Sequence, residues 1–236
     1  GGWGVPPNPN ANPPANPTLT LDFEQSVVAG VAGPDASEST TNFSTTPGNG
    51  RLMLAVIATL DNSTNATLTV TNSASSAYTL VGSYVRRAKL GLEMTLSIWK
   101  RIASQGASEI GIKVTPNQAV SRVVSALEFS GQNATPIGDT NSNVGNADPM
   151  TTGAVTIDIG TECVVAAFLA ALAPDTVTLT AGFTLQIDHN DGTIDSTDIQ
   201  LYVGYELARA AGSLNVEGNF AGGADEFAAM VVEIKD

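Results

Sequence analysis

One pattern of apolar and polar residues occurs twice in the sequence. Residues 95–114 are TLSIWKRIASQGASEIGIKV, and residues 201–220 are LYVGYELARAAGSLNVEGNF. In both copies, apolar and polar side chains alternate on either side of a glycine-containing break, which is the pattern of two paired β-strands. Each copy therefore predicts a β-hairpin, and the two together predict a duplicated β unit. Aligning the copies gives four matched positions: Gly212 on Gly106, Tyr205 on Trp99, Val216 on Ile110 and Phe220 on Val114.

Two further pairs of segments extend the match. Residues 162–172 (ECVVAAFLAAL) align with residues 51–60 (RLMLAVIATL), and both runs are apolar on both faces. A strand of this kind is expected in the middle of a sheet that is covered on both sides. Residues 226–235 (EFAAMVVEIK) align with residues 122–130 (RVVSALEFS). The duplication therefore covers nearly everything after the first residues of the chain.

The composition predicts an all-β fold. Of the 236 residues, 42% are hydrophobic and only 14% are charged, and Thr, Ser, Asn, Ala, Gly and Val dominate. This mixture is poor in helix formers and rich in β-branched and turn residues. Many short strands separated by turn signals indicate an antiparallel β-sandwich or jelly roll. We expect two homologous repeats, residues 18–131 and 132–236, packed as one body, although the pattern also allows two separate sandwiches.

Residues 1–17 (GGWGVPPNPNANPPANP) predict an extended N-terminal arm. Six prolines exclude a helix or a central strand and favour a polyproline-like path. Apolar side chains near the tip suggest that the arm docks on a surface. We expect a neighbouring subunit to supply that surface, with the arm's own body as the alternative. The predicted contact residues are Trp3, Val5, Pro6, Pro7 and Pro9.

The net charge of the chain argues against several classes of partner. The formal net charge is −13, from 23 acidic and 10 basic residues, so the overall field repels phosphate backbones and anionic lipid. We therefore expect neither nucleic acid nor membrane as a partner, and no apolar run approaches the length of a membrane span.

The single Cys163 cannot form an internal disulfide and is expected to be a buried, small hydrophobe. No cluster of metal-ligating residues appears, and we predict no cofactor.

The polar residues offer three candidate sites, each with a simpler explanation. His189, the only histidine, would have to serve any Ser-His-Asp triad or zinc site, but it also suits a polar loop. The acidic segment 188–198 contains enough oxygen ligands for calcium, or is simply solvated. Glu128 and Glu233 occupy matched positions and could form a glycosidase pair, although duplication alone explains both. No G-x-S-x-G motif surrounds any serine, and we expect the protein not to be an enzyme.

Aromatic residues suggest a different kind of site. Trp99, Tyr202 and Tyr205 could form a platform on which sugar rings stack. The simpler explanation is that aromatic residues on matched strands belong to the core.

The order of motifs resembles a known family. The motifs are LMLAVIATL, YTLVGS, IWKRIASQGASEIGIKVT, ALEFSGQNATPIG and AAMVVEIKD, and the likeness spans residues 19–236. The pattern is similar to a family of duplicated, jelly-roll-like β-sandwich proteins of tailed-phage virions and bacterial surfaces. Members usually have Gly-Val-Asp after the FS of the first repeat, where this chain has Gly131-Gln132-Asn133. The difference lies in a turn, and the resemblance supplies no catalytic residues.

The resemblance implies a structural and binding role at a virion surface or in the extracellular space. We expect a capsid decoration or fibre-like component that contacts other copies of itself or other virion proteins through its arm. One alternative is a carbohydrate-binding adhesin or tail receptor-binding module that contacts host-surface glycans. Another is a subunit of an extracellular filament, in which a strand or the arm completes the sheet of the next subunit.

Overall fold

A computed structural model describes residues 20–61, 65–89, 91–104, 106–171, 176–190, 199–222 and 226–236. These residues form antiparallel β-strands and one short 3-10 helix, so the all-β prediction is confirmed. No helix in this part of the chain is long and apolar enough to cross a membrane. The elements are β1 (Asp22–Asp35), β2 (Ser39–Asn42), β3 (Leu52–Asp61), β4 (Leu68–Asn72), β5 (Thr79–Lys89), β6 (Leu92–Ile102), η1 (Ala107–Ile110), β7 (Gly111–Pro116), β8 (Val120–Ser130), β9 (Ile137–Gly145), β10 (Met150–Ile157), β11 (Glu162–Ala171), β12 (Val177–Leu179), β13 (Thr184–Asn190), β14 (Ile199–Arg209), β15 (Gly212–Phe220) and β16 (Phe227–Ile234).

The two halves of the chain have the same strand order. In the first half, sheet A has the order β1-β8-β3-β6-β5 and sheet B the order β2-β7-β4. In the second half, sheet C has the order β13-β14-β11-β16-β9 and sheet D the order β10-β15-β12. Adding eight to each strand number of sheets A and B reproduces sheets C and D. Each half is thus a five-stranded sheet covered by a three-stranded one.

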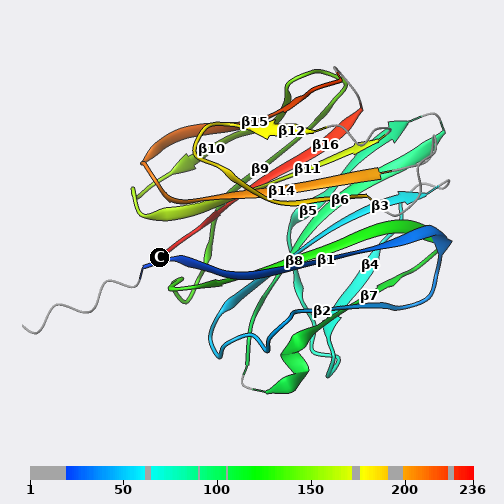
Figure 1. Cartoon of the computed structure of the whole chain (residues 1–236), viewed down its shortest axis with the longest axis horizontal. Coiled ribbons are helices and arrows are strands. Elements are labelled where there is room, and N and C mark those ends of the chain that lie inside the picture. Colours follow the sequence, from blue (N-terminus) through cyan, green and yellow to red (C-terminus); the bar gives the residue numbers. More distant parts are fainter. Residues whose placement is uncertain are drawn as a thin grey trace, which may run out of the picture.

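The four sheets stack as layers in the order B, A, C, D (Figure 1). One apolar cluster lies between sheets A and B, and a second lies between sheets C and D. A third joins the two halves, because it combines side chains of sheet A, such as Leu54 and Leu127, with side chains of sheet C, such as Val165 and Val232. Both five-stranded sheets are therefore buried on both faces.

The central strands explain the two apolar runs in the sequence. Every residue of β3 is buried, with Leu54 facing the cluster between the halves and Met53 facing sheet B. Strand β11 repeats this arrangement, since Val165 faces the first half and Val164 faces sheet D. The prediction that these runs are covered on both sides is confirmed. The alternation of strand side chains requires apolar residues at both odd and even positions here.

The contact between the halves has the pattern of a two-fold interface. Strand β1 packs against β13, and the matched strands β9 and β5 pack against each other. Likewise, β8 contacts β14 while β16 contacts β6. Reciprocal contacts of this kind are typical of an isologous dimer, here formed within one chain.

The predicted hairpins are wrong. Strand β6 pairs with β3 and β5 in sheet A, whereas β7 pairs with β2 and β4 in sheet B. The matched strands β14 and β15 also lie in different sheets. A period of two beside a turn shows that two strands follow each other, but it does not distinguish pairing within one sheet from a crossing to the facing sheet.

The predicted match between Trp99 and Tyr205 is displaced by one residue. Glu128 lies opposite Met53 and Glu233 opposite Val164, so the next residues of the central strands, Leu54 and Val165, also match. Lys100 lies opposite Leu54 and Tyr205 opposite Val165. Tyr205 therefore corresponds to Lys100, not to Trp99.

A β-bulge causes this displacement. Two residues of β14, Leu207 and Ala208, occupy the space opposite the single residue Cys163, and Ala208 has a φ of 52°. The first half has no extra residue there, since β3 and β6 pair continuously. An alignment of the two sequences that matches the turns cannot place this extra residue correctly, and a one-residue slip exchanges the two faces of a strand.

Candidate functional site

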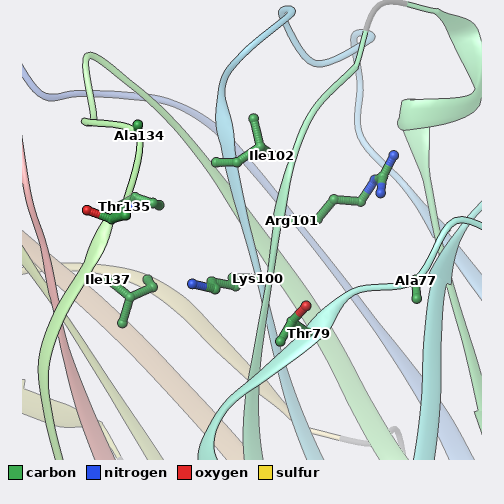
Figure 2. A pocket seen from close by; sticks show the side chains of 9 residues that line it. Ala77, Thr79, Lys100, Arg101, Ile102, Ala134, Thr135 and Ile137 are labelled. Carbon is green, nitrogen blue, oxygen red and sulfur yellow. The ribbon is translucent and has the colours of Figure 1, made fainter.

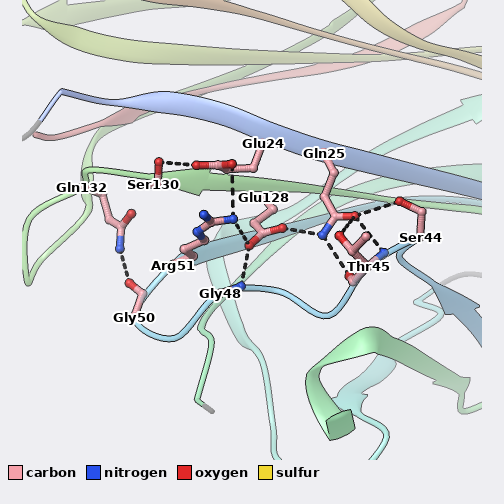
Figure 3. A network of polar contacts seen from close by, with 10 residues as sticks. All are labelled: Glu24, Gln25, Ser44, Thr45, Gly48, Gly50, Arg51, Glu128, Ser130 and Gln132. Atoms are coloured by element: carbon pink, nitrogen blue, oxygen red, sulfur yellow. Dashed lines mark hydrogen bonds and ion pairs between the residues drawn. The ribbon is translucent and has the colours of Figure 1, made fainter. Parts of the chain in front are cut away.

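Glu128 is a buried carboxylate that fixes a loop in the first half (Figure 3). Its Oε1 accepts hydrogen bonds from the backbone N–H of Gly48 at 2.8 Å and from Nη1 of Arg51 at 3.1 Å. Its Oε2 accepts a hydrogen bond from Nε2 of Gln25 at 2.5 Å. These bonds connect β8 to β1 and to the segment that leads into β3. Several polar partners make the burial of this charge tolerable.

Glu233 has the corresponding place in the second half. It is fully buried and accepts hydrogen bonds from the backbone N–H groups of Asp139, at 2.7 Å, and Asp158, at 3.3 Å. Its neighbour is Glu162, which stands where the first half has Arg51. Burial, and then the hydrogen bond with Glu233, raise the pKa of Glu162. This position therefore combines two carboxyl groups, with the Lys235 ammonium 3.8 Å from Glu233 Oε2.

The structure does not bring Glu128 and Glu233 together. Glu128 lies on the face of sheet A that carries Met53 and meets sheet B. Glu233 lies on the face of sheet C that carries Val164 and meets sheet D. The apolar cluster between sheets A and C separates the two faces. The two carboxylates therefore cannot flank one glycosidic bond, and each has a structural role.

Another buried carboxylate, Glu109, was not singled out by the sequence. Its oxygens accept hydrogen bonds from Nε and Nη2 of Arg101 at 3.1 and 2.9 Å, from Ser104 Oγ at 2.5 Å and from Asn72 Nδ2 at 3.1 Å. Burial alone would raise the pKa of Glu109, but the hydrogen bonds from Arg101, Ser104 and Asn72 outweigh it and lower the pKa to about 2. The network ties the crossing from β6 to β7 to strand β4. In the sequence, Glu109 alternates with apolar residues as an exposed polar residue of a strand does, and only its closeness to the turn distinguishes it.

The aromatic residues are placed differently from one another. Trp99 is buried between sheets A and B, where its Nε1 donates a hydrogen bond to Ser97 Oγ at 3.0 Å. Tyr202 is buried between sheets C and D. Neither offers a ring face to a glycan, so the simpler explanation, a place in the core, describes both. Tyr205 is half-buried and stacks on Phe23, with ring centroids 4.6 Å apart and an interplanar angle of 19°.

The remaining predicted sites lie at the edge of the described structure or beyond it. His189 belongs to the end of β13 rather than to a loop, and the neighbouring Asp188 accepts a hydrogen bond from Gln200 Nε2. Residues 191–198, which contain most of the proposed calcium loop, lie outside the described residues, as does the arm with Trp3, Val5, Pro6, Pro7 and Pro9. Among the described residues, no three His, Cys, Asp or Glu side chains are placed to hold a metal ion. Cys163 is buried, and burial raises the pKa of its thiol.

A pocket of about 320 Å³ lies where sheet A meets the connection between the halves (Figure 2). Thr79, Lys100 and Ile102 line it from β5 and β6, Thr135 lines it from the connection, and Ile137 lines it from the start of β9. The Lys100 side chain extends toward Ile137 and Thr135, and the Arg101 guanidinium turns away from them. The pocket has both polar and apolar walls, as ligand sites usually do.

The charge in this pocket comes from Lys100. Arg101 is neutralised by its ion pair with Glu109, at 2.9 Å. No acidic group in the described part of the chain forms an ion pair with Lys100. The pocket therefore presents one uncompensated cation, although the chain carries a net charge of −13.

Comparison of the chain with protein-family models, with curated proteins and with solved structures gives no match.

Proposed function

We propose that the protein is a structural component of a virion surface or an extracellular layer. In this proposal the β body is a rigid module, and the N-terminal arm docks it to other copies of the chain or to other structural proteins. The observation that carries the proposal is the use of the buried carboxylates Glu109, Glu128 and Glu233. Each binds backbone or side-chain groups that hold connections between strands. This use supports a rigid scaffold rather than a reaction centre.

We also propose that residues 18–131 and 132–236 are homologous, jelly-roll-like repeats. Their identical strand order supports this origin, as do the matched positions of Glu128 and Glu233. The shared apolar cluster supports a single body rather than two linked sandwiches. A rigid body of this kind suits a capsid decoration or a fibre-like component.

The role of the arm rests on its sequence. Six prolines in residues 1–17 stiffen the segment, and a stiff segment loses less conformational entropy on docking than a flexible one. Trp3 and Val5 supply apolar surface that a neighbour can bury. The segment contains no charged side chain, so its docking is expected to depend little on salt.

Deletion of residues 1–17 tests the proposal. The shortened chain is expected to keep the circular dichroism spectrum and thermal stability of the full chain, and to lose incorporation into the native assembly as seen by electron microscopy. A matched full-length variant, Trp3→Ala with Val5→Ala, should show the same loss, whereas Asn8→Ala with Asn10→Ala should assemble normally. Normal incorporation of the deleted chain would refute docking by the arm. Helical rather than icosahedral particles would assign the protein to a filament.

The pocket favours a second candidate function, carbohydrate binding by an adhesin or a tail receptor-binding module. Lys100, Thr79 and Thr135 line it with polar side chains, and Ile102 is 42% exposed beside them. A glycan array with the full chain distinguishes the two functions, because a purely structural protein gives no signal. If an array signal persists in the Lys100→Gln variant, it comes from another site.

A further inference from the structure

The pocket beside Lys100 has a filled counterpart in the other half of the molecule. Tyr205 occupies the register position that corresponds to Lys100. Their neighbours on the edge strands also match, because Thr79 lies opposite Lys100 and Thr184 lies opposite Tyr205. The two places are therefore equivalent points of sheets A and C.

The connection between the halves completes this correspondence. Phe23 lies opposite Phe129 on β8, and Ile137 lies opposite Ile234 on β16. Phe129 and Ile234 are themselves matched, since each follows a matched glutamate. Ile137 is therefore the counterpart of Phe23.

The two equivalent places differ in what fills them. In one, the rings of Phe23 and Tyr205 stack at 4.6 Å, and Phe129 packs edge-on against Tyr205 at 6.0 Å. In the other, Ile137 and Lys100 replace both rings and leave a pocket of about 320 Å³. An isoleucine has no ring, and the Lys100 amine requires polar surroundings, so these two residues cannot close the space as the stacked rings do.

The exposed apolar surface follows the same difference. Leu207, beside Tyr205, packs against the cluster between the halves. Ile102, at the end of β6 beside Lys100, is 42% exposed and lines the pocket. The pocket thus has apolar side walls at Ile102 and Ile137, threonine side chains at Thr79 and Thr135, and an ammonium group at Lys100.

We propose that this pocket binds a small organic anion made of one six-membered ring and a carboxylate. The ring takes the place that a stacked side chain fills in the other half, between the isoleucine walls. The carboxylate pairs with Lys100 and accepts a hydrogen bond from the hydroxyl of Thr79, which lies opposite Lys100 on the neighbouring strand. The anion comes from outside the arm, because residues 1–17 contain no acidic side chain. This site is independent of the docking role proposed for the arm.

Two probes separate the sources of such a ring. Glucuronate represents an acidic sugar, and benzoate represents an aromatic carboxylate. Each is titrated into the ¹⁵N-labelled full chain and followed by amide chemical shifts, with glucose and benzyl alcohol as neutral controls. We expect saturable shifts centred on Lys100 and Thr135 with at least one acid and none with its neutral control. Preference for glucuronate assigns the site to acidic glycans, and preference for benzoate assigns it to aromatic acids.

Two variants test the mechanism. Lys100→Gln should weaken binding of the acid about tenfold or more, because a hydrogen bond to a charged group is lost. Lys113→Gln, which removes a lysine of sheet B, is the matched control and should bind normally. The double variant Lys100→Tyr with Ile137→Phe copies the filled counterpart, and should abolish binding without lowering the melting temperature.

Three results would overturn the proposal. The first is the absence of shifts with both acids at concentrations in the tens of millimolar. The second is equal binding of acids and neutral controls. The third is unchanged binding by Lys100→Gln, which decides the matter even if the double variant fails to fold. None of these results bears on incorporation through the arm, so the two proposals can fail separately.

Discussion

Glu128 and Glu233 lie at the same register position of the two halves, and each accepts a backbone N–H from the connection that leads into a central strand. The same arrangement thus occurs in each half, on the buried face of the five-stranded sheet that meets the three-stranded sheet. What differs is the neighbour, which is Arg51 in the first half and Glu162 in the second.

Removal of Glu128 should destabilise the protein strongly. Glu128→Ala leaves the Gly48 N–H without its acceptor and removes one of the two acceptors of the Gln25 amide, so we expect a loss of about 2–4 kcal/mol in the free energy of unfolding. Urea denaturation measures it. Glu233→Ala should cost less, because it also removes the crowding of Glu162 by a second carboxyl group. A loss that is larger for Glu233→Ala would contradict this comparison.

Glu109 should stabilise the protein above mildly acidic pH. Its folded-state pKa of about 2 lies below its ordinary value of 4.5, so the ionised form is favoured by folding. This stabilisation is fully present above pH 4.5 and is lost as the pH falls toward 2. Glu109→Gln should therefore cost about 2–3 kcal/mol at neutral pH and much less near pH 2. Urea denaturation of both proteins across this range provides the test, and a constant difference would exclude the mechanism.

Glu162 should destabilise the protein as the pH rises, which is the opposite of the effect of Glu109. Burial and the bond with Glu233 raise its pKa, which the Ile159 N–H and Lys235 lower only in part. Folding therefore favours the protonated form, and its stabilisation is full below the ordinary value of 4.5 and is lost as the pH rises through the folded-state pKa. Glu162→Gln cannot ionise and should gain melting temperature relative to the wild type between about pH 4 and pH 8. Arg51→Gln, at the matched position, should show no such gain.

Trp99 should behave as a core residue. Trp99→Ala removes a large side chain from the cluster between sheets A and B and should cost about 3–5 kcal/mol. A Trp3→Phe variant leaves Trp99 as the only tryptophan, and its fluorescence should be resistant to acrylamide quenching. Efficient quenching would show that Trp99 is exposed, as a glycan platform requires.

The stack of Phe23 on Tyr205 should contribute more to the stability of the protein than Ile137 does at the equivalent place in the other half. Phe23→Ala opens the contact between the halves and should cost about 3 kcal/mol in the free energy of unfolding. Ile137→Ala removes a residue that already borders a pocket and should cost less. Chemical denaturation of both variants tests the difference, and equal costs would mean that the two places are packed alike.

The sequence predicted the central strands well. A run such as β3, apolar at every position, has few places in an all-β protein other than a sheet covered on both sides. The match of Glu128 with Glu233 was also correct, because no residue is inserted between the paired segments. Both predictions rested on continuous strands, where a period of two is preserved.

The sequence failed where strands cross or bulge. The hairpin prediction could not distinguish a turn within sheet A from the crossing to sheet B, since both place a polar break between alternating segments. The extra residue near Ala208 displaced the match of Tyr205. The pocket was missed for the same reason, because its residues become related only once Lys100 is matched with Tyr205 and Ile137 with Phe23.

Because sheets A and C share one apolar cluster, each half of the chain shields the apolar face of the other half from water. A polypeptide that ended after Ser130 would present Leu54, Leu127 and their neighbours to water and would aggregate. When it is mixed with a polypeptide of residues 131–236, sheet C of that polypeptide would cover the apolar face of sheet A. The two fragments are therefore expected to fold together when mixed, so that folding of one fragment shows that the other is present.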